Sequence, residues 1–378
     1  MSPFWQEAIQ NVALPALYAL AMIAVVMTCA GYSVLLERKV AAWIQGRPGP
    51  NRTTVPLLAA IPLVGRWVQR LGLVQLPADG AKFLFKEDPL PAHVRTFPYL
   101  AAPCVALAPA LVALVMLPFG QTGTGNAARP LMLCNADAGF LFVFAVSAMG
   151  VYGVLLAGWA SNSKYSFLGA VRGAAQVISY ELTLALSVLP VVLATALPAA
   201  HSGAASPLNL YEIVHAQGGA WNAFTQPLGA LLFLTAIFAE SNRQPFDMPE
   251  SETDLVGGFH TEYGSFKFGL FFVGEYGHML IGSALFILFF LGGWNLPFVA
   301  QEDIGGGALA AALGVAVFLA KLFLLVFFFI WMRWTLPRFR YDQVMRLGWT
   351  RLLPLALANT VLYFLIYGLL DAPAGATR

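Results

Sequence analysis

Charged residues are scarce in this chain. Only 11% of its 378 residues are Asp, Glu, Lys or Arg, whereas 59% are hydrophobic. A soluble domain usually carries about 25% charged residues, so this shortage argues against a soluble enzyme and against a nucleic-acid-binding protein. The composition instead indicates a polytopic membrane protein.

Cysteine and histidine are also few. The three cysteines, Cys29, Cys104 and Cys134, lie far apart and form no Cys-x-x-Cys pair, which argues against an iron–sulfur or zinc site. Of the five histidines, only His278 falls deep in a long apolar run, which argues against a haem held between paired histidines. We therefore expect no metal site in this chain.

Long apolar runs are abundant. A helix needs roughly 20 apolar residues to cross a bilayer, and eight runs approach that length, near residues 14–36, 98–119, 137–160, 175–199, 222–240, 264–291, 308–332 and 351–370. The sequence shows no internal repeat of the kind that marks many transporters. We predict an all-α polytopic fold, with one membrane domain over residues 1–378 and about eight transmembrane helices.

Basic residues are distributed unevenly about these runs. All of the 21 except Arg129, Lys321 and Arg378 follow the first, third, fifth or seventh run. Because basic loops stay in the cytoplasm, segments 37–97 and 241–263 are predicted to be cytoplasmic functional loops, and both termini periplasmic. The first run is too long for the core of a signal peptide and no Lys or Arg precedes it, so we expect no cleaved signal.

The first cytoplasmic loop contains two segments that are not simply solvated. Residues 57–74 are apolar but are interrupted by a proline and two arginines, so they are too short to span the bilayer and fit an interfacial position. Further along, Asp79, Lys82 and Lys86 recur at helical spacing with phenylalanines between them. This pattern predicts a short amphipathic helix at the membrane surface.

Acidic residues gather around the fifth and sixth runs. Glu240 closes the fifth run and Glu275 lies well inside the sixth, while the loop between them carries Glu250, Glu252 and Asp254 at alternate positions. A charge in hydrocarbon is costly and usually marks a proton or ion path. An acidic run is ordinarily a solvated face, but the prolines and aromatic residues beside this one indicate that the loop folds against the protein. We interpret the set as a proton relay that enters the membrane from the cytoplasm.

Two further charges fall inside predicted spans. Glu181 lies one to two turns into the fourth helix, where it is either a neutral packing residue or a carrier of protons, and we favour the second role. Lys321 lies roughly in the middle of the seventh helix and needs a partner. Glu275 and Glu181 are both possible partners for it.

The chain also carries several long and unusual strings in a fixed order. They are Glu37-Arg38-Lys39, Gly46-Arg47-Pro48-Gly49-Pro50-Asn51-Arg52, Ala78-Asp79-Gly80-Ala81-Lys82, Gly158-Trp159-Ala160-Ser161-Asn162-Ser163-Lys164-Tyr165, Ser179-Tyr180-Glu181, Asn242-Arg243-Gln244-Pro245-Phe246-Asp247 and Pro337-Arg338-Phe339-Arg340-Tyr341-Asp342-Gln343. Over nearly its whole length the chain thereby resembles the quinone-chamber membrane subunit of bacterial respiratory complex I, the proton-pumping NADH:quinone oxidoreductase.

The resemblance implies three groups of functional residues. The quinone passage would be formed by Arg38, Trp43, Arg47, Asp79 and Arg243. The acidic loop beneath the quinone cavity would carry Glu250, Glu252 and Asp254. A glutamate path into the membrane arm would run through Glu181, Glu240, Glu262 and Glu275.

The resemblance also implies a function and partners. The chain would be a membrane subunit of the oxidoreductase that forms the quinone entry passage and couples quinone reduction to proton translocation. Quinone would be its substrate, and the chain would bind no NAD, flavin or iron–sulfur cluster of its own. Its partners would be soluble iron–sulfur subunits at the quinone site and antiporter-like membrane subunits, in the inner (plasma) membrane of a bacterium.

Some features depart from the family, and other functions stay open. Residues 53–72 look longer and more apolar than the usual segment, and His278 near Glu275 is unexpected. The alternatives are a quinone-free ion-translocating subunit of a related membrane-bound hydrogenase, a free-standing ion transporter and a structural anchor. Retention of the strings in 37–52 and 241–254 favours the quinone enzyme, the missing inverted repeat argues against a transporter, and an anchor leaves the intramembrane acids unexplained.

Overall fold

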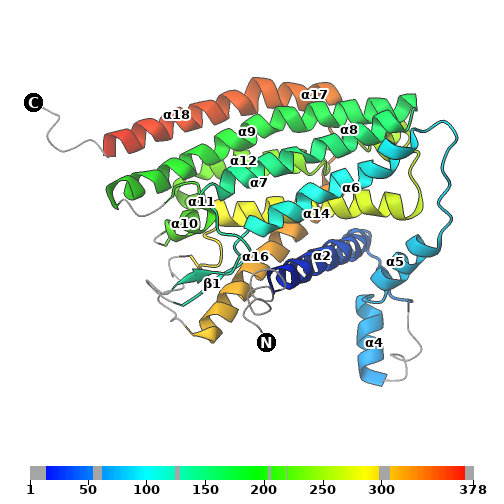
Figure 1. The fold of residues 1–378 in the computed structure, drawn as a ribbon, viewed down its shortest axis with the longest axis horizontal. Helices are drawn as coiled ribbons and strands as arrows, with labels where there is room; N and C mark the ends of the chain where they lie inside the picture. The colour runs from blue at the N-terminus through cyan, green and yellow to red at the C-terminus, as the bar shows by residue number, and fades with distance from the viewer. Residues whose placement is uncertain are drawn as a thin grey trace, which may run out of the picture.

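The computed structural model describes residues 14–53, 62–123, 128–202, 206–218, 220–297 and 307–370, and these are almost entirely helical (Figure 1). The helices that form the bundle are α2 (Leu14–Ile44), α6 (Thr96–Ala113), α7 (Gly139–Ala148), α8 (Gly150–Ala160), α9 (Lys164–Ser202), α12 (Pro227–Glu240), α14 (Ser265–Phe290), α16 (Ala308–Thr335) and α18 (Leu353–Leu370). The shorter elements are α4 (Pro62–Leu71), α5 (Gln75–Phe85), η2 (Leu114–Met116), α10 (Leu210–His215), α11 (Asn222–Thr225), α13 (Glu252–Leu255), η4 (Gly258–His260), α17 (Tyr341–Leu347) and η5 (Gly348–Leu352), together with the antiparallel strands β1 (Gln121–Thr122) and β2 (Arg129–Pro130).

Seven helical stretches in the described part are long and apolar enough to cross a membrane. They match seven of the eight predicted spans, with α7 and α8 forming one stretch and α17, η5 and α18 another. The fifth predicted span is the exception, because α12 has only 14 residues and rises about 21 Å, less than the ~30 Å of a bilayer core. The all-α, multi-pass membrane fold is confirmed.

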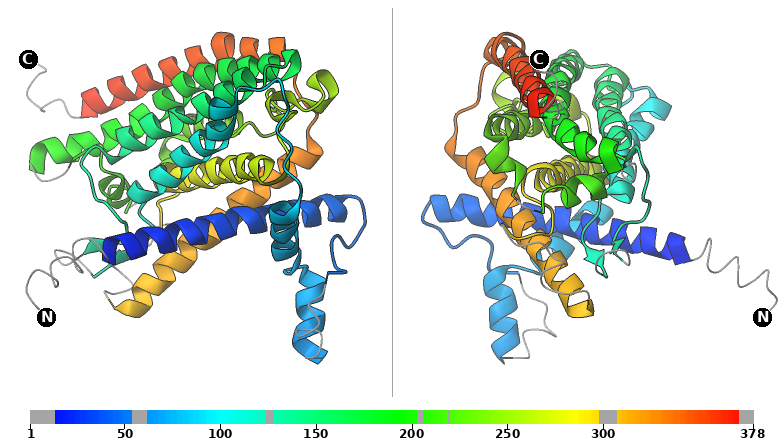
Figure 2. Two further views of the ribbon diagram at one scale, coloured as in Figure 1. Left: turned by 45° about the vertical axis from the view of Figure 1, so that its right-hand side comes forward. Right: turned by 90° about the vertical axis from the view of Figure 1, so that its left-hand side faces the viewer.

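The direction of the helices agrees with an even number of crossings. The beginning of α2 and the end of α18 lie at one end of the bundle, and α5 and α17 lie at the other (Figures 1 and 2). This arrangement requires the short α12 to count as a crossing. The first and last helices that the structure describes therefore begin and end at the same end of the bundle, and the side of the membrane on which the chain ends lie stays a prediction.

The spans approach one another most closely where small residues meet. A Cβ atom on Gly153 of α8 would lie 2.5 Å from the backbone of Ala106 in α6, and one on Gly158 would lie 2.3 Å from the Cβ of Ala170 in α9. Backbones can come this close only where a side chain is missing. Around these contacts α14 occupies the middle of the bundle and is the most deeply buried of the candidate spans.

Two short helices lie beside the bundle at the end that carries α17. Helix α4 runs across the direction of the spans, and α5 connects it back to the bundle (Figure 2). The bounds of α5 contain Asp79 and Lys82, so the amphipathic helix predicted from the spacing of these residues is present. Helix α4 lies within the apolar segment 57–74 that was predicted to be interfacial, although residues 57–61 of that segment lie outside the described part.

Candidate functional site

The acidic loop, residues 241–263, folds back against the bundle. Gln176 of α9 donates two hydrogen bonds of 2.7 Å, one to the carbonyl oxygen of Ala239 and one to that of Phe246. These bonds fasten the end of α12 and the beginning of the acidic loop to α9. Arg243, which lies in this part of the loop, is consequently buried, and the prediction that the loop folds against the protein is confirmed.

A cluster of ionic groups lies where the acidic loop meets α2, α14 and α16. We call it the buried ion cluster, and its members are Glu37, Arg243, Glu275, Tyr276 and Arg333. Glu37 pairs with Arg333 at 2.8 Å and with Arg243 at 3.4 Å, and its carboxylate accepts a hydrogen bond from the hydroxyl of Tyr276. Arg243 also lies 4.0 Å from the carboxylate of Glu275, and its guanidinium carbon is 3.9 Å from the ring centroid of Tyr276.

Arg243 is held in this cluster mainly by charge. Burial disfavours a guanidinium cation, but the groups around it, among them Glu37 and Glu275, outweigh burial and raise the pKa of Arg243 above its ordinary value. Its Nε and Nη2 atoms make no hydrogen bond within the described residues. A permanently charged arginine among acids stabilises their ionised forms, so Arg243 sets how many protons the cluster holds.

Glu250 extends the cluster into the acidic loop. Its carboxyl group is within hydrogen-bonding reach of Glu275 and lies 3.6 Å from Nε2 of His260. Burial opposes its ionisation, but the hydrogen bond from Glu275 and the positive charges of His260 and Arg243 hold the pKa of Glu250 below its ordinary value. Two carboxyl groups can share a hydrogen bond only if one of them carries a proton, so this pair is suited to hold a shared proton.

Asp247 is the other buried acid of the loop. Its carboxylate pairs with Arg338 at 2.5 Å, and Arg338 also donates a hydrogen bond of 3.2 Å to Ser251. Burial and then the negative charge of Glu250 raise the pKa of Asp247 to about 6, while Arg338 and Arg333 offset part of this rise. Asp247 therefore titrates close to the range in which a proton can be exchanged at physiological pH.

The remaining acids that were predicted for this region lie elsewhere. Asp254 is exposed and pairs with Arg172 at 3.2 Å, and hydrogen bonds from Ser251 and Arg172 hold its pKa below its ordinary value. Glu262 lies 3.7 Å from Nε2 of His93, in contacts separate from the buried ion cluster. The side chain of Glu252 lies outside the described residues.

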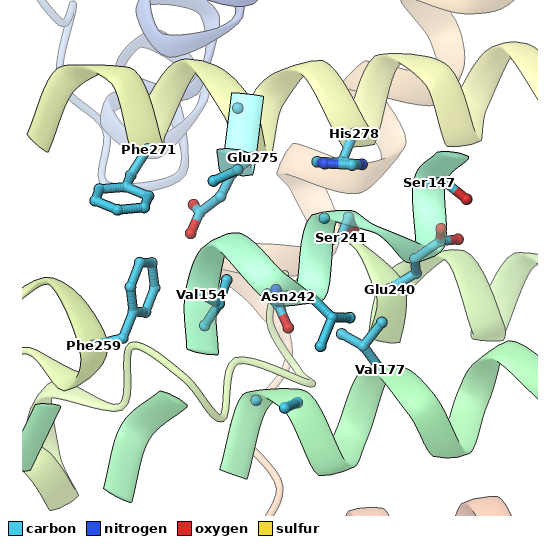
Figure 3. A pocket seen from close by; sticks show the side chains of 16 residues that line it. Ser147, Val154, Val177, Glu240, Ser241, Asn242, Phe259, Phe271, Glu275 and His278 are labelled. Carbon is cyan, nitrogen blue, oxygen red and sulfur yellow. The ribbon is translucent and has the colours of Figure 1, made fainter. Parts of the chain in front are cut away.

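A small cavity separates the two intramembrane acids of α12 and α14. It has a volume of about 40 Å³ and is lined by Glu240, Glu275, Ser147, Asn242 and His278 among others (Figure 3). One water needs about 10–15 Å³ on the same measure, so two or three waters fit. Most of the lining is apolar, but several polar side chains reach the space, among them both carboxyl groups and His278, and these give a water the partners it needs.

Glu240 connects this cavity to the fourth predicted span. It is hydrogen-bonded to Ser147 of α7 and lies close enough to Glu181 of α9 for the two charges to interact. Three of the four predicted glutamates, Glu181, Glu240 and Glu275, are therefore brought into one series. Glu262 is the member that the structure does not join to it.

An apolar groove runs between α2, α5 and α14, and we call it the α5 groove. It has a volume of about 410 Å³, and Arg38 and Asp79 lie among its lining residues, paired with each other at 2.6 Å. Of the other residues predicted for a quinone passage, Trp43 lines a different groove, between α2, α4 and α16. Arg47 is exposed and hydrogen-bonds to Gln45.

Lys321 has backbone partners and not the glutamates considered for it. Its ammonium group donates to the carbonyl oxygens of Leu291, Gly293 and Asn295 at 2.6, 2.9 and 2.6 Å, and it lies 4.4 Å from the centre of the Trp221 ring. These carbonyls follow the end of α14, where unpaired carbonyls carry partial negative charge. Lys321 therefore caps that helix and takes no part in the series of acids.

Several members of the site were not expected from the sequence. Glu37 and Arg333 stand at the ends of apolar helices, where charges ordinarily anchor a helix at the membrane edge, and Tyr276 follows Glu275 within a span. Their one sequence signal is the string Glu37-Arg38-Lys39, in which an acid precedes two bases. No group of His, Cys, Asp or Glu in the described part is arranged to hold a metal ion.

Removal of the central cation should destabilise the fold. We expect Arg243→Met to lower the free energy of unfolding by about 3–5 kcal/mol, because it leaves Glu37 and Glu275 buried with less compensation. Thermal or denaturant unfolding of the purified protein in detergent measures this. The matched control is Arg340→Met, whose partner Asp342 is largely exposed and which should leave stability unchanged. Equal effects of the two substitutions would contradict the assignment.

Asp247 should impose a pH dependence on stability. Its folded-state pKa of about 6 exceeds the ordinary value of 3.8, so the fold prefers the protonated acid and loses stability as pH rises through about 6. We expect Asp247→Asn to remove this decline. The measurement is the unfolding midpoint of both proteins from pH 5 to 8. The difference between them should change up to about pH 7 and then level off, and a constant difference would contradict the prediction.

Comparison with known proteins places the chain in a family. The family model for NADH dehydrogenase matches residues 17–364. The chain is 45% identical over 336 residues to a subunit of the NADH-quinone oxidoreductase of Geobacter metallireducens, covering 89% of this chain and 91% of the relative. It is 43% identical over 375 residues to the equivalent protein of Bdellovibrio bacteriovorus (88% and 91%) and 42% identical over 347 residues to that of Leptospira biflexa (89% of each). The chain therefore belongs to the NADH dehydrogenase family, as a homologue of these NADH-quinone oxidoreductase subunits.

Proposed function

We propose that this chain is the membrane subunit of an NADH-quinone oxidoreductase that admits quinone and passes protons into the membrane arm through its buried glutamates. One observation carries the proposal. Glu250, Glu275, Glu240 and Glu181 form a series that leads from the acidic loop into the bundle, with a cavity for water between Glu275 and Glu240. Buried ionisable groups in a membrane protein are costly and mark such paths.

The α5 groove is suited to admit the quinone tail. It is mostly apolar and lies between the spans and α5, and the pair Arg38–Asp79 gives it a polar end. Its volume is in the range of ligand pockets. Arg38 directly follows Glu37 in α2, so the polar end of the groove lies at the same level along α2 as the buried ion cluster. A quinone that enters here would bring its headgroup towards the acids that must respond to it. A quinone-free hydrogenase subunit would have no use for such a passage.

The coupling follows from charge balance. Reduction of a quinone to a quinol takes up two electrons and two protons, and the electrons would come from soluble iron–sulfur subunits. Charge that develops near the acidic loop changes the balance between Arg243 and the acids around it. Because Glu250 and Glu275 share a proton, such a change would drive that proton along the series towards Glu240. Antiporter-like membrane partners would receive it beyond Glu181.

The proposal also implies an orientation of the chain in the membrane. The basic residues of segments 37–97 and 241–263 favour a cytoplasmic position for the end of the bundle that carries α5, α17 and the acidic loop. The first and last helices then start and end on the periplasmic side of the bacterial inner membrane. The soluble partners would dock on the end where the acidic loop lies.

The glutamate series is tested by neutral substitutions in the assembled enzyme. We expect Glu240→Gln and Glu275→Gln each to lower NADH:quinone reductase activity, or the protons pumped per electron, by roughly tenfold or more, because an amide cannot carry a proton. Reductase rates and proton uptake in membrane vesicles measure both quantities. Glu87→Gln, at an exposed cytoplasmic position, is the control and should behave as wild type. Wild-type turnover and pumping in both path variants would refute the proposal.

The passage is tested by narrowing the α5 groove. Gly269 lines it, and the nearest atom to an added Cβ would be 3.9 Å away on Phe83, so a leucine fits without a clash and occupies the space of a ligand. We expect Gly269→Leu to raise the KM for a long-tailed quinone several-fold and to affect a short-tailed quinone much less. Gly368→Leu on the exposed face of α18 is the control. An equal effect on both quinones would argue against entry through this groove.

A further inference from the structure

Proton transfer between Glu275 and Glu240 is the step of the series that has to cross the cavity. The two carboxyl groups belong to different helices, and the cavity lies between them. A third ionisable side chain, that of His278, lines the same cavity. A role for His278 in this step rests on the proposed function, since it concerns the same proton path.

His278 stands where a carrier between the two acids would have to stand. It is three residues after Glu275 in α14 and therefore on the same helix face. In the view of Figure 3 its ring lies between the carboxyl groups of Glu275 and Glu240. The cavity that all three share has room for two or three waters, which can bridge distances too long for a direct hydrogen bond.

The surroundings of His278 fix one of its ring nitrogens. One nitrogen is hydrogen-bonded to the backbone carbonyl of Ala106 in α6, and because a carbonyl only accepts, that nitrogen keeps its proton. The other nitrogen of the neutral ring therefore carries a lone pair that can accept a proton. The ring fits because residue 150 is glycine. A Cβ atom added at this position would lie only 3.0 Å from Nε2 of His278.

The cavity contains no competing charge among the described residues. The ionisable lining residues are Glu275 and His278 of α14 and Glu240 of α12. The lining residues from α6, α7, α8, α9, η4 and the acidic loop have hydroxyl, amide, glycine or apolar groups. The break between α7 and α8 at Met149 also falls beside this space, since Ser147 and Gly150 line it on either side of the break. The imidazole thus faces two carboxyl groups across a space that can hold water.

We propose that His278 is a proton carrier that relays protons between Glu275 and Glu240. The free ring nitrogen takes the proton that protonated Glu275 releases, directly or through a water. The resulting imidazolium is flanked by two carboxyl groups, and the same nitrogen then gives its proton through water to the carboxylate of Glu240. Glu275 ends ionised, Glu240 ends protonated and the histidine ends neutral, so one proton has moved and no other reactant is consumed.

Imidazole is chemically suited to this step, because a neutral histidine both accepts and returns a proton within the physiological pH range. The competing explanation is that His278 only fills space beside Gly150. If His278 only packs, its substitution would affect assembly and stability, but the pH dependence of the rate would contain no contribution from its protonation. The pH profile of coupled turnover therefore separates the two roles.

The test uses the assembled enzyme in membrane vesicles and the substitutions His278→Gln and His278→Phe. Glutamine keeps a donor for the carbonyl of Ala106, and phenylalanine keeps the ring, but neither carries a proton. We expect both to assemble and to lower coupled quinone reductase activity about threefold or more, with a flatter pH profile between pH 6 and 8. His215→Gln, on α10 at the opposite end of the bundle from the acidic loop, is the matched control and should leave rate and profile unchanged.

Parallel measurement of Glu240→Gln and Glu275→Gln distinguishes a failure of the role of His278 from a failure of the proposed glutamate path. If those variants lose activity while His278→Gln and His278→Phe keep the wild-type rate, pumping and pH profile, the role of His278 is overturned and the glutamate path stands. If the glutamate variants are also wild type, the proposed function itself fails. If His278→Gln does not assemble, the same measurements on His278→Asn decide the matter.

Discussion

A permanently charged guanidinium held away from bulk water is the constraint on which this site depends. Arg243 cannot discharge itself by losing a proton, so the fold must surround it with acids, and Glu37, Glu275 and Glu250 meet that need from α2, α14 and the acidic loop. Removing one partner from such an arrangement costs much more free energy than the whole arrangement contributes to stability. Three segments that are distant in the sequence are therefore fixed relative to one another by a single side chain.

The acids around Arg243 are more numerous than one cation can neutralise. Glu37 is shared with Arg333, whereas Glu275 and Glu250 lie within hydrogen-bonding reach of each other and are suited to share a proton. Excess acid beside a fixed cation gives a site whose proton content responds to any further charge placed nearby. A quinone whose charge changes during reduction is one such influence, which is why the position of the α5 groove at the same level along α2 as Glu37 matters.

Much of the fold followed from the sequence, because apolar length and the placement of basic residues are properties of the chain alone. The fifth span was harder: the apolar run 222–240 includes α11 and a turn, so the helix itself begins only at Pro227. Three members of the glutamate series were recognised as acids inside apolar runs. Glu37 was not placed among them, since an acid beside Arg38 and Lys39 looks like a membrane-edge anchor. Partners such as the carbonyls around Lys321 depend on where another helix ends, and no local pattern reveals this.

The capped end of α14 has a mechanical consequence. Lys321 binds three carbonyl oxygens just beyond that end, so the helix cannot slide along its axis without giving up all three bonds. Glu275 and His278 sit on the same helix, further towards the acidic loop. When their charges change, α14 would therefore respond by tilting or twisting about its capped end. Such a movement turns the face that carries Glu275 and His278 relative to α6, α8 and α12, and it leaves the depth of α14 in the bilayer unchanged.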